Sequence, residues 1–432
     1  MKLEIPKSLK ELCLLFAQQN SPLYLVGGYV RNSLLGFVET DIDICGPLRY
    51  DKVQKMLSGT IFDAKVKNEK LGTLLIKSKV SEEEFEYTTF RKENYSRGGN
   101  HSPDDVCFIT DIREDASRRD FTCNAVYYNI SNNSIIDFFG GTDDTFKRVL
   151  KTVNLPEITF DDDGLRILRL ARMSAELDFE IDENCYNIAK AKIEQLKDIS
   201  QERFNKEILS ILFADFKYDA ISNPNAPLKG ISVLSDFGAW GYIFRQLAFE
   251  YGIKNINEKL KEKWCYSIVS SPSFHRVSLF TYEILNALKL PINSKNINAI
   301  LGQDGLMLSK KEVLLQTRIL CGIEDIKTLV NDDIRIFIIK NSEIISRILS
   351  LARILGIGEN IQAVYNFMKM DNAPFSVKEL AISGNDIIEN FPNIPRQKYG
   401  ELFNAMLLRC AITPELNTKK NLFNILKGKE KC

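Results

Sequence analysis

The segments that resemble β-strands are confined to the first third of the chain. Up to about residue 140, short runs rich in β-branched and aromatic residues alternate with turns, as in "LYLV", "TDIDIC", "EFEYTTF" and "AVYYNI". Two stretches between them, 8–20 and 29–36, have helical periodicity. From Asp163 to the end helical periodicity dominates, with breaks at stretches such as "SNPNAPLKG" and "NFPNIPRQKYG". This distribution predicts an α+β domain followed by an all-helical remainder.

The charge balance and the histidine content exclude several classes of protein. The 57 Lys and Arg residues equal the 57 Asp and Glu residues, so any nucleic-acid partner has to be bound by local basic patches. His101 and His275 are the two histidines of the sequence. A histidine-rich metal centre such as that of an HD phosphohydrolase therefore cannot be built.

The cysteines and the apolar segments predict a cytoplasmic protein. The nine cysteines include no CxxC pair, which favours reduced thiols and argues against a zinc site. The apolar run at 12–17 is too short for the core of a signal peptide. No stretch reaches the roughly 18 apolar residues of a membrane span, so we expect no membrane partner.

A glycine pair in "LYLVGGYVRNSLLG", residues 23–36, lies between a predicted strand and a predicted helix. Gly27 and Gly28 would let the backbone approach a ligand closely, and the helix N-terminus offers unpaired N–H groups to a phosphate. Arg31 could contact the same anion. Taken alone, such a pair is more often a tight turn.

Two aspartates in "TDIDI" strengthen the case for a phosphate site. Asp41 and Asp43 are two residues apart on a predicted strand, so both carboxylates project from one face and repel each other unless a cation lies between them. Mg²⁺ prefers oxygen ligands and substrate phosphates. Glu84 and Glu86, on another alternating strand, offer a third carboxylate, of which we favour Glu86. An isolated DxD is commonly a solvated strand edge, but together with the glycine pair it predicts two-metal nucleotidyl transfer.

Two further segments carry clustered charges. "SRRDFTCNAVYYN" places Arg119 and Asp120 just before a strand, where they could contact a phosphate and a ribose or form a surface ion-pair cluster. "DDDGLRILRLARMSAEL" repeats charged residues every three positions along a helix, at Asp163, Arg166, Arg169 and Arg172. A salt-bridged surface helix is the alternative interpretation of this stripe.

These segments together resemble the class II tRNA nucleotidyltransferases, the CCA-adding group that includes bacterial poly(A) polymerases. "LVGGYVRNSLLG…DID" is similar to motif A of that family, "RRDFTCNA" matches motif B in full, and "DDGLRILRLAR" is similar to motif D. A later ER…E motif is present as Glu202, Arg203 and Glu207. The resemblance spans residues 23–207 and departs from the family at Asn32 and Asp162, where Asp and Glu are usual.

The resemblance implies roles for the motif residues. Asp41 and Asp43 would carry Mg²⁺. Glu86 is our candidate for the third catalytic carboxylate from its strand position alone, and the resemblance adds nothing to it. The residues that would bind the triphosphate, the ribose and the base of the nucleotide are Gly27, Gly28, Arg31, Arg119, Asp120, Asp163, Arg166, Arg169 and Arg172.

The proposed base-reading pair, Asp163 and Arg166, has its own chemical logic. An aspartate accepts a hydrogen bond from an exocyclic amine, and an arginine donates one to the adjacent ring nitrogen, a combination that fits both cytosine and adenine. Guanine and uracil present a carbonyl beside a ring N–H. Each group left unpaired there would cost about 1 to 3 kcal/mol, so one protein pair could replace a nucleic-acid template.

The resemblance also predicts the domain organisation. A DNA polymerase beta-like nucleotidyltransferase head with a mixed sheet would occupy 1–140, followed by a helical neck at 141–215 that bears the base-reading motif. A helical body would occupy 216–335 and a helical, tRNA-binding tail 336–432. The polar, glycine-bearing stretch at 91–106 would be the mobile loop that switches the pocket from C to A.

The predicted activity is the addition of C, C and A to tRNA 3′ ends from CTP and ATP. The loop at 91–106 favours full CCA addition over CC addition alone. A poly(A) polymerase is the main alternative, although the G-[RK]-R-F stretch associated with those enzymes is not visible. A catalytically silent RNA-binding protein on the same scaffold is a third possibility, against which the intact DID pair argues.

Overall fold

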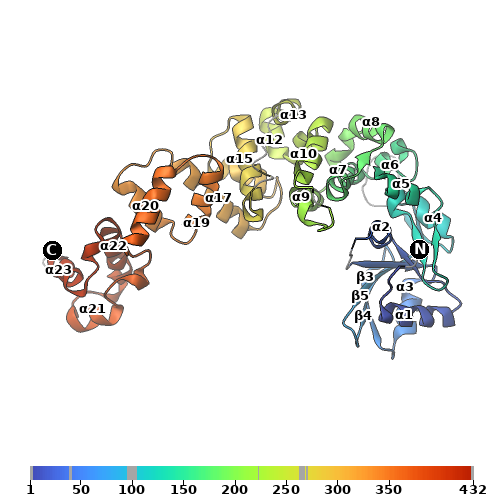
Figure 1. Ribbon diagram of the computed structural model, residues 1–432, viewed down its shortest axis with the longest axis horizontal. Helices are drawn as coiled ribbons and strands as arrows, with labels where there is room; N and C mark the ends of the chain where they lie inside the picture. The colour runs from blue at the N-terminus through green and yellow to red at the C-terminus, as the bar shows by residue number, and fades with distance from the viewer. Residues whose placement is uncertain are drawn as a thin grey trace. The chain divides into compact units, whose positions relative to one another are not determined.

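The structure is a computed structural model that describes residues 3–37, 41–94, 105–221, 223–261, 268 and 271–429. The chain divides into two compact units, the first formed by 1–269 with 299–308 and the second by 270–298 with 309–432. All strands of the described residues belong to the first unit (Figure 1). The finer boundaries near residues 140, 215 and 335 stay predictions.

A mixed sheet of seven strands forms the centre of the N-terminal part, in the order β3-β4-β5-β2-β1-β8-β9. Neighbouring strands run antiparallel except β2 and β5, which are parallel, and the predicted mixed sheet is thereby confirmed. A separate hairpin pairs β6 with β7. The strands are β1 (Tyr24–Val26), β2 (Ile42–Gly46), β3 (Phe62–Asn68), β4 (Thr73–Ser78), β5 (Glu84–Thr89), β6 (Arg91–Asn94), β7 (Asp105–Phe108), β8 (Tyr127–Asn129) and β9 (Ser134–Ile136).

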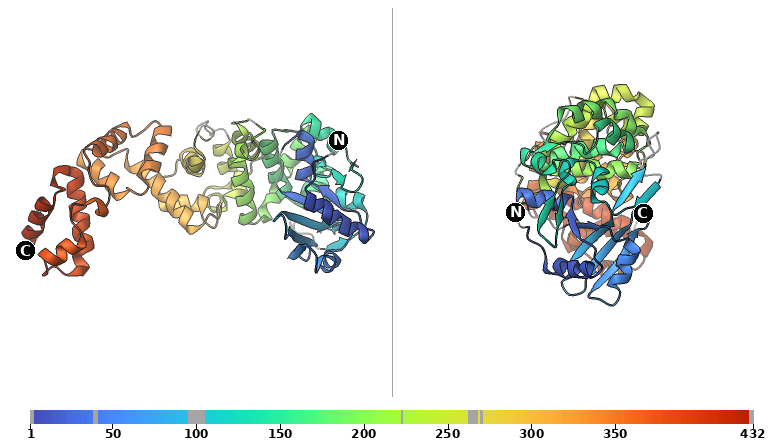
Figure 2. Two further views of the ribbon diagram at one scale, coloured as in Figure 1. Left: turned by 60° about the horizontal axis from the view of Figure 1, so that its bottom comes forward. Right: turned by 90° about the vertical axis from the view of Figure 1, so that its right-hand side faces the viewer.

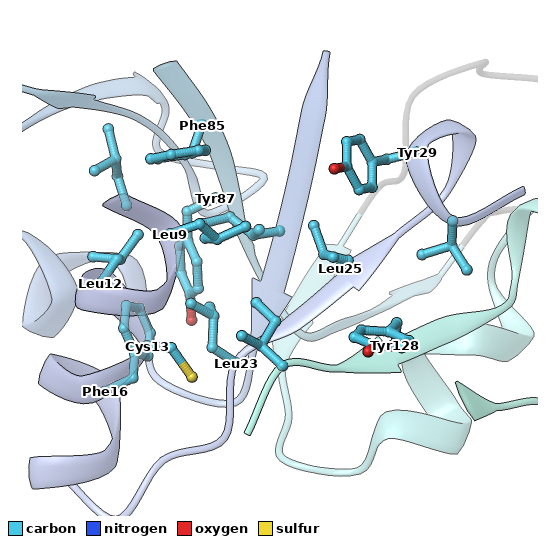
Figure 3. Close-up of a cluster of buried hydrophobic side chains, with 14 of the residues drawn as sticks. Leu9, Leu12, Cys13, Phe16, Leu23, Leu25, Tyr29, Phe85, Tyr87 and Tyr128 are labelled. Carbon is cyan, nitrogen blue, oxygen red and sulfur yellow. The ribbon is translucent and has the colours of Figure 1, made fainter. Parts of the chain in front are cut away.

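Helix α1 covers one face of this sheet. Its residues Leu9, Leu12 and Phe16 recur at helical spacing and are fully buried. Figure 3 shows them beside side chains of β1 and β5, and the ring of Phe16 lies 5.4 Å from that of Tyr87. Burial of such side chains stabilises the fold by about 1.5 to 3 kcal/mol each. The helices of this part are α1 (Lys7–Gln18), α2 (Gly28–Leu35), α3 (Tyr50–Leu57), α4 (Ile112–Ser117) and α5 (Gly141–Lys147).

The predicted helices at 8–20 and 29–36 correspond to α1 and α2, and each strand-like segment quoted above contains a strand. The sequence analysis missed β3, β6 and the helices α3, α4 and α5. Strand β2 begins at Ile42, so Asp41 precedes the strand instead of lying within it. Both ends of the predicted mobile loop, 91–94 and 105–106, are paired in the β6–β7 hairpin; residues 95–104 lie outside the described residues.

The remainder of the first unit is helical apart from a short parallel ladder of β10 and β11. Helices α7, α9 and α10 pack together. A Cβ on Gly230 of α10 would lie only 2.7 Å from Cγ2 of Ile211 of α9, so α9 and α10 approach too closely for a larger residue at position 230. Trp240 is fully buried and donates from Nε1 to Oγ of Ser235 at 2.8 Å. The elements are β10 (Val149–Leu150), α6 (Pro156–Asp162), α7 (Leu165–Leu177), β11 (Glu180–Ile181), α8 (Glu183–Ala191), α9 (Gln201–Leu212), α10 (Ala226–Phe237), α11 (Trp240–Ile243), α12 (Arg245–Tyr251) and α13 (Ile253–Leu260).

The second unit consists of helices, shown from yellow to red in Figure 2. Within the described part of the chain, no helix combines the length and the apolar character that crossing a bilayer requires. Helix α16 (Ser294–Leu301) spans the boundary between the units. The other helices are α15 (Arg276–Leu288), α17 (Lys310–Asp325), α18 (Asp332–Lys340), α19 (Ile345–Ile354), α20 (Glu359–Met370), α21 (Gly384–Asn390), α22 (Tyr399–Ile412) and α23 (Lys419–Lys429).

His275, a fully buried residue of the second unit, makes the stability of this unit depend on pH. Burial, and then the charge of Arg347, lowers the pKa of His275 to about 4. Below pH 6.5 the unfolded chain binds a proton that the folded unit excludes, so stability falls as the pH drops from about 6.5 to about 4, by roughly 3 kcal/mol. Urea unfolding followed by circular dichroism at several pH values would measure this loss. The loss of stability should be smaller in His275→Asn. An equal dependence of the unfolding free energy on pH in both proteins would contradict the prediction.

Candidate active site

The glycine turn between β1 and α2 brings two charged side chains together. Gly27 has φ +72° and ψ −137°, a conformation that is essentially restricted to glycine. A Cβ on Gly27 would lie 3.6 Å from Oδ2 of Asp43 and 4.0 Å from Nη1 of Arg119. The turn therefore lies beside an acid of the DID motif and an arginine of the RRDFTCNA motif, and its predicted contact with a phosphate stays a prediction.

Two of the predicted carboxylates, Asp43 and Glu86, lie on neighbouring strands, and Asp41 directly precedes the first of them. Asp41 and Asp43 are exposed, and Asp43 is directly opposite Glu86 across the parallel pair of β2 and β5, so both side chains are on one face of the sheet. Lys67 of β3 donates a hydrogen bond to Glu86. This hydrogen bond, together with the charges of Glu86, Asp43 and Asp41, raises the pKa of Lys67.

This set of donors fits a hard divalent cation. Asp41 and Asp43 supply oxygen ligands, and their mutual repulsion is relieved by positive charge. Within residues 3–37, 41–94, 105–221, 223–261, 268 and 271–429, no three His, Cys, Asp or Glu side chains are arranged as a complete metal site. Mg²⁺ commonly uses one or two protein carboxylates and takes its other ligands from water and substrate phosphates.

Arg31 is buried and points toward the helical part of the unit. It donates from Nη1 to Oδ1 of Asn124 at 2.6 Å and from Nη2 to the hydroxyl of Tyr218 at 3.2 Å. Its Nε donates to Oδ1 of Asn32 at 3.0 Å. The amide of Asn32 thus accepts the bond that a carboxylate would accept at this position.

Asp120 joins the motif before β8 to helix α7. Its Oδ1 accepts from Nδ2 of Asn124 at 3.1 Å, and its Oδ2 accepts from Nε of Arg169 at 2.8 Å and from Nη2 of the same residue. Burial favours the neutral acid, but the charge of Arg169 and these hydrogen bonds hold the pKa of Asp120 well below its usual range. Asp120 is buried, and it forms an ion pair with Arg169, whose side chain is partly exposed.

The charged stripe of α7 divides into two parts. Asp163 precedes the helix and accepts from the backbone N–H of Leu165 at 3.0 Å and from Nη2 of Arg203 at 3.0 Å. Arg166 is buried and donates from Nη2 to the backbone oxygen of Arg118 at 2.9 Å. Arg172 donates to two acids instead, Glu207 at 2.6 Å and Glu176 at 2.8 Å.

A cleft of about 650 Å³ lies beside these residues. It contains Arg119 and Asp120 from the second motif and Asp163, Arg166 and Arg169 from the third, so the structure brings these two predicted groups into one site. The carboxylates of the DID motif and Arg172 do not line it, although Arg119 connects it to Gly27 and Asp43. The complete lining is Asn68, Lys70, Leu71, Arg91, Glu93, Arg118, Arg119, Asp120, Asp163, Leu165, Arg166, Arg169 and Arg203.

The cleft suits a small anion in both size and charge. Pockets of about 300 to 1,000 Å³ bind small ligands. Seven lining side chains are basic and three are acidic, a balance of +4. Such a balance favours a polyanion such as a nucleoside triphosphate.

The chain is similar to several known proteins. Residues 23–151 match the family model described as the poly A polymerase head domain. The CCA-adding enzyme of Ligilactobacillus salivarius is 28% identical over 407 residues, which cover 92% of this chain and 90% of that protein. The chain is a nucleotidyltransferase that is similar to the CCA-adding enzymes.

Other relatives of this family match over shorter regions. The CCA-adding enzyme of Streptococcus suis is 36% identical over 197 residues, 45% of this chain and 46% of that protein. The chain therefore spans about half the length of several curated relatives that it matches at higher identity. Among solved structures, the Bacillus stearothermophilus CCA-adding enzyme in complex with CTP has a TM-score of 0.70 at 22% identity, with 99% of this chain and 100% of that chain covered. At this identity the likeness shows that the two chains share a fold.

Four charged residues near the cleft of this nucleotidyltransferase were not predicted from the sequence. Arg91, Glu93 and Arg118 line it, and Asp115 lies buried behind them. Asp115 could have been found, because it precedes Arg118 by three residues and Arg119 by four, the spacings at which side chains meet on a helix. Arg91 and Glu93 carry no comparable local signal.

We expect that alanine in place of Gly27 impairs this nucleotidyltransferase. Forcing the left-handed conformation on a residue with a Cβ costs about 1 to 3 kcal/mol, and the added methyl group would lie between Asp43 and Arg119. Thermal unfolding and nucleotide addition should both report the change. Gly36→Ala is the matched control, because Gly36 has φ +77° with no atom within 4 Å of the added Cβ; it should lose stability and keep its activity. Equal activity losses in both variants would contradict a local role of Gly27.

Proposed function

We propose that the chain is a CCA-adding enzyme that attaches C, C and A to tRNA 3′ ends from CTP and ATP without a nucleic-acid template. The observation that carries this proposal is the shared cleft, in which Asp163 and Arg166 lie together with Arg119 and Asp120. The same activity is supported by the CCA-adding enzyme of Ligilactobacillus salivarius, which is similar to this chain over most of the length of both proteins. The solved complexes of CCA-adding enzymes with CTP, ATP and tRNA support these substrates.

The base would be read by Asp163 and Arg166. A carboxylate accepts several hydrogen bonds, so Asp163 can accept from an exocyclic amine while Arg203 and the N–H of Leu165 hold its orientation. The guanidinium of Arg166 is fixed against the backbone oxygen of Arg118. A rigid acceptor beside a rigid donor selects cytosine and adenine, because guanine and uracil would leave both groups unpaired.

The triphosphate would lie between the base-reading pair and the DID motif. Arg119 reaches this region from one side and the Gly27 turn from the other, and Asp120 keeps Arg169 in the wall of the cleft. Asp41 and Asp43 would hold Mg²⁺, which when bound lowers the pKa of the attacking hydroxyl and neutralises charge on the leaving pyrophosphate. Glu86 remains our candidate for the third carboxylate.

We further propose that the enzyme binds tRNA and is located in the cytoplasm. The helical tail at 336–432 would contact tRNA through backbone and shape. The seven cysteines that the structure describes are all free thiols, which agrees with a reducing cytoplasm.

The proposal is tested with purified full-length protein, Mg²⁺ and tRNA that ends at the discriminator base. CTP, ATP or both are supplied, and the 3′ ends are sequenced. Addition of two C and a single A supports the proposal, and chelation of Mg²⁺ should stop the reaction. Long A tails would identify a poly(A) polymerase, CC alone a CC-adding variant, and unchanged tRNA a binding protein.

A further inference from the structure

A buried carboxylate lies behind the wall of the cleft. Asp115, on the short helix α4, has no exposed surface. Its Oδ1 accepts from the backbone N–H of Arg91 at 3.1 Å and from Nε of Arg118 at 2.9 Å. Its Oδ2 accepts from the hydroxyl of Tyr127 at 2.6 Å and from Nη2 of Arg119 at 3.3 Å. One side chain thus binds four residues from three segments of the chain.

Asp115 is charged in this environment. Burial alone would raise its pKa, but the charges of Arg118 and Arg119 and the hydrogen bond from Tyr127 hold the pKa of Asp115 at about 2. The ionised carboxylate is therefore the counter-ion of both arginines throughout the physiological pH range. Removing its charge would leave two guanidinium groups close to each other without their buried anion.

The network continues to the base of the β6–β7 hairpin. Glu93 accepts from Nε of Arg91 at 2.7 Å and from Nη1 of Arg118 at 3.3 Å. Positive and negative groups therefore alternate along the wall, in the order Arg91, Glu93, Arg118, Asp115 and Arg119. All of them except Asp115 line the cleft.

The position of Arg119 is the point at which this network meets the glycine turn. Its Nε donates to the hydroxyl of Tyr127 at 2.9 Å, and its Nη2 donates to Asp115. Its Nη1 lies 4.0 Å from where a Cβ on Gly27 would be, next to Oδ2 of Asp43 at 3.6 Å from the same point. Asp115 and Tyr127 hold two nitrogens of the guanidinium and thereby aim the third at the phosphate side of the site.

We propose that Asp115 is a positioning residue for the nucleoside triphosphate, acting through Arg119 and Arg118. This inference rests on the proposed function, since it takes the cleft to be the triphosphate site. Asp115 does not touch the nucleotide. It fixes the directions in which the two arginines donate. It also accepts from the backbone N–H of Arg91 and so holds the start of β6 beside them.

The test compares Asp115→Asn with the wild type. The amide retains the shape and one acceptor oxygen, but it has no charge and presents N–H groups to Arg119 or Tyr127. We expect the KM for both CTP and ATP to rise about 10- to 100-fold, with a much smaller change in kcat. Affinity for CTP, measured by calorimetry without tRNA, should fall by the same factor. Glu114→Gln, one residue away on the exposed side of α4, should keep wild-type values.

A double-mutant cycle separates positioning from general destabilisation. If Asp115 acts through Arg119, the loss caused by Asp115→Asn should largely disappear in an Arg119→Ala background. Additive losses would overturn the proposal, and so would an unchanged KM in the single variant. Tyr127→Phe removes the hydroxyl that links the two residues, and it decides the question if Asp115→Asn does not fold. It should raise the KM several-fold; no change would overturn the proposal.

The same measurements distinguish this inference from the proposed function. Wild-type protein that binds CTP while Asp115→Asn binds it equally well overturns only the role of Asp115. Wild-type protein that binds neither CTP nor ATP overturns both. Wild-type protein that makes long A tails revises the proposed function and leaves the expected KM effect for ATP in place.

Discussion

Asparagine in place of Asp43 is expected to slow nucleotide addition by about a thousandfold or more, because several kcal/mol of charge stabilisation would be lost with the carboxylate. Asp43 is opposite Glu86 and beside Gly27, so it lies where the sheet and the glycine turn meet. Asp41→Ala should have a similar effect. Single-turnover extension of tRNA at saturating CTP measures the loss.

The binding of tRNA provides the control for this experiment. Filter binding should show affinities of both variants close to that of the wild type, because Asp41 and Asp43 serve the nucleotide in our proposal. Asp63→Asn, which removes an exposed carboxylate of β3 that pairs with Lys79, should remain fully active. Activity within about tenfold of the wild type in either active-site variant would remove that residue from the proposed metal site.

The second large effect concerns selectivity. Asp163→Asn should reduce the preference for CTP over UTP by about 10- to 100-fold, since an amide can donate to the carbonyl oxygen that a carboxylate repels. The change keeps the acceptor for the backbone N–H of Leu165, so helix α7 should still begin normally. Values of kcat/KM for CTP, ATP, UTP and GTP would report the effect.

Asp161→Asn is the matched control for selectivity. Asp161 lies two residues earlier, is exposed and pairs with Lys192, so its loss should leave all four kcat/KM ratios unchanged. An unaltered CTP to UTP ratio in Asp163→Asn would show that another group reads the base.

Local sequence patterns predicted the parts of the site that depend on neighbouring residues. The strand-glycine-helix order predicted the turn at Gly27, and two-residue alternation placed Asp43 and Glu86 on strand faces. Their juxtaposition also needed the parallel pairing of β2 with β5, which no local pattern reveals. The link from Arg31 to Tyr218 joins residues 187 positions apart and depends on the packing of the helical part against the sheet.

The stripe on α7 shows where a periodic pattern can mislead. Residues three apart on a helix are rotated by about 300°, so a row of charges at this spacing drifts steadily around the axis. Arg172 lies six residues after Arg166 and is therefore about 120° away from it. It faces Glu207 of α9 instead of the cleft, and its predicted part in the nucleotide pocket stays a prediction.

The division into two units has a practical consequence for spectroscopy. The sequence has two tryptophans, and neither falls in 270–298 or 309–432. Indole emission would thus report on the first unit, which includes the buried Trp240, and not on the second unit. A fluorescence melt that disagrees with a far-ultraviolet melt would consequently reveal that the two units lose their structure in separate steps.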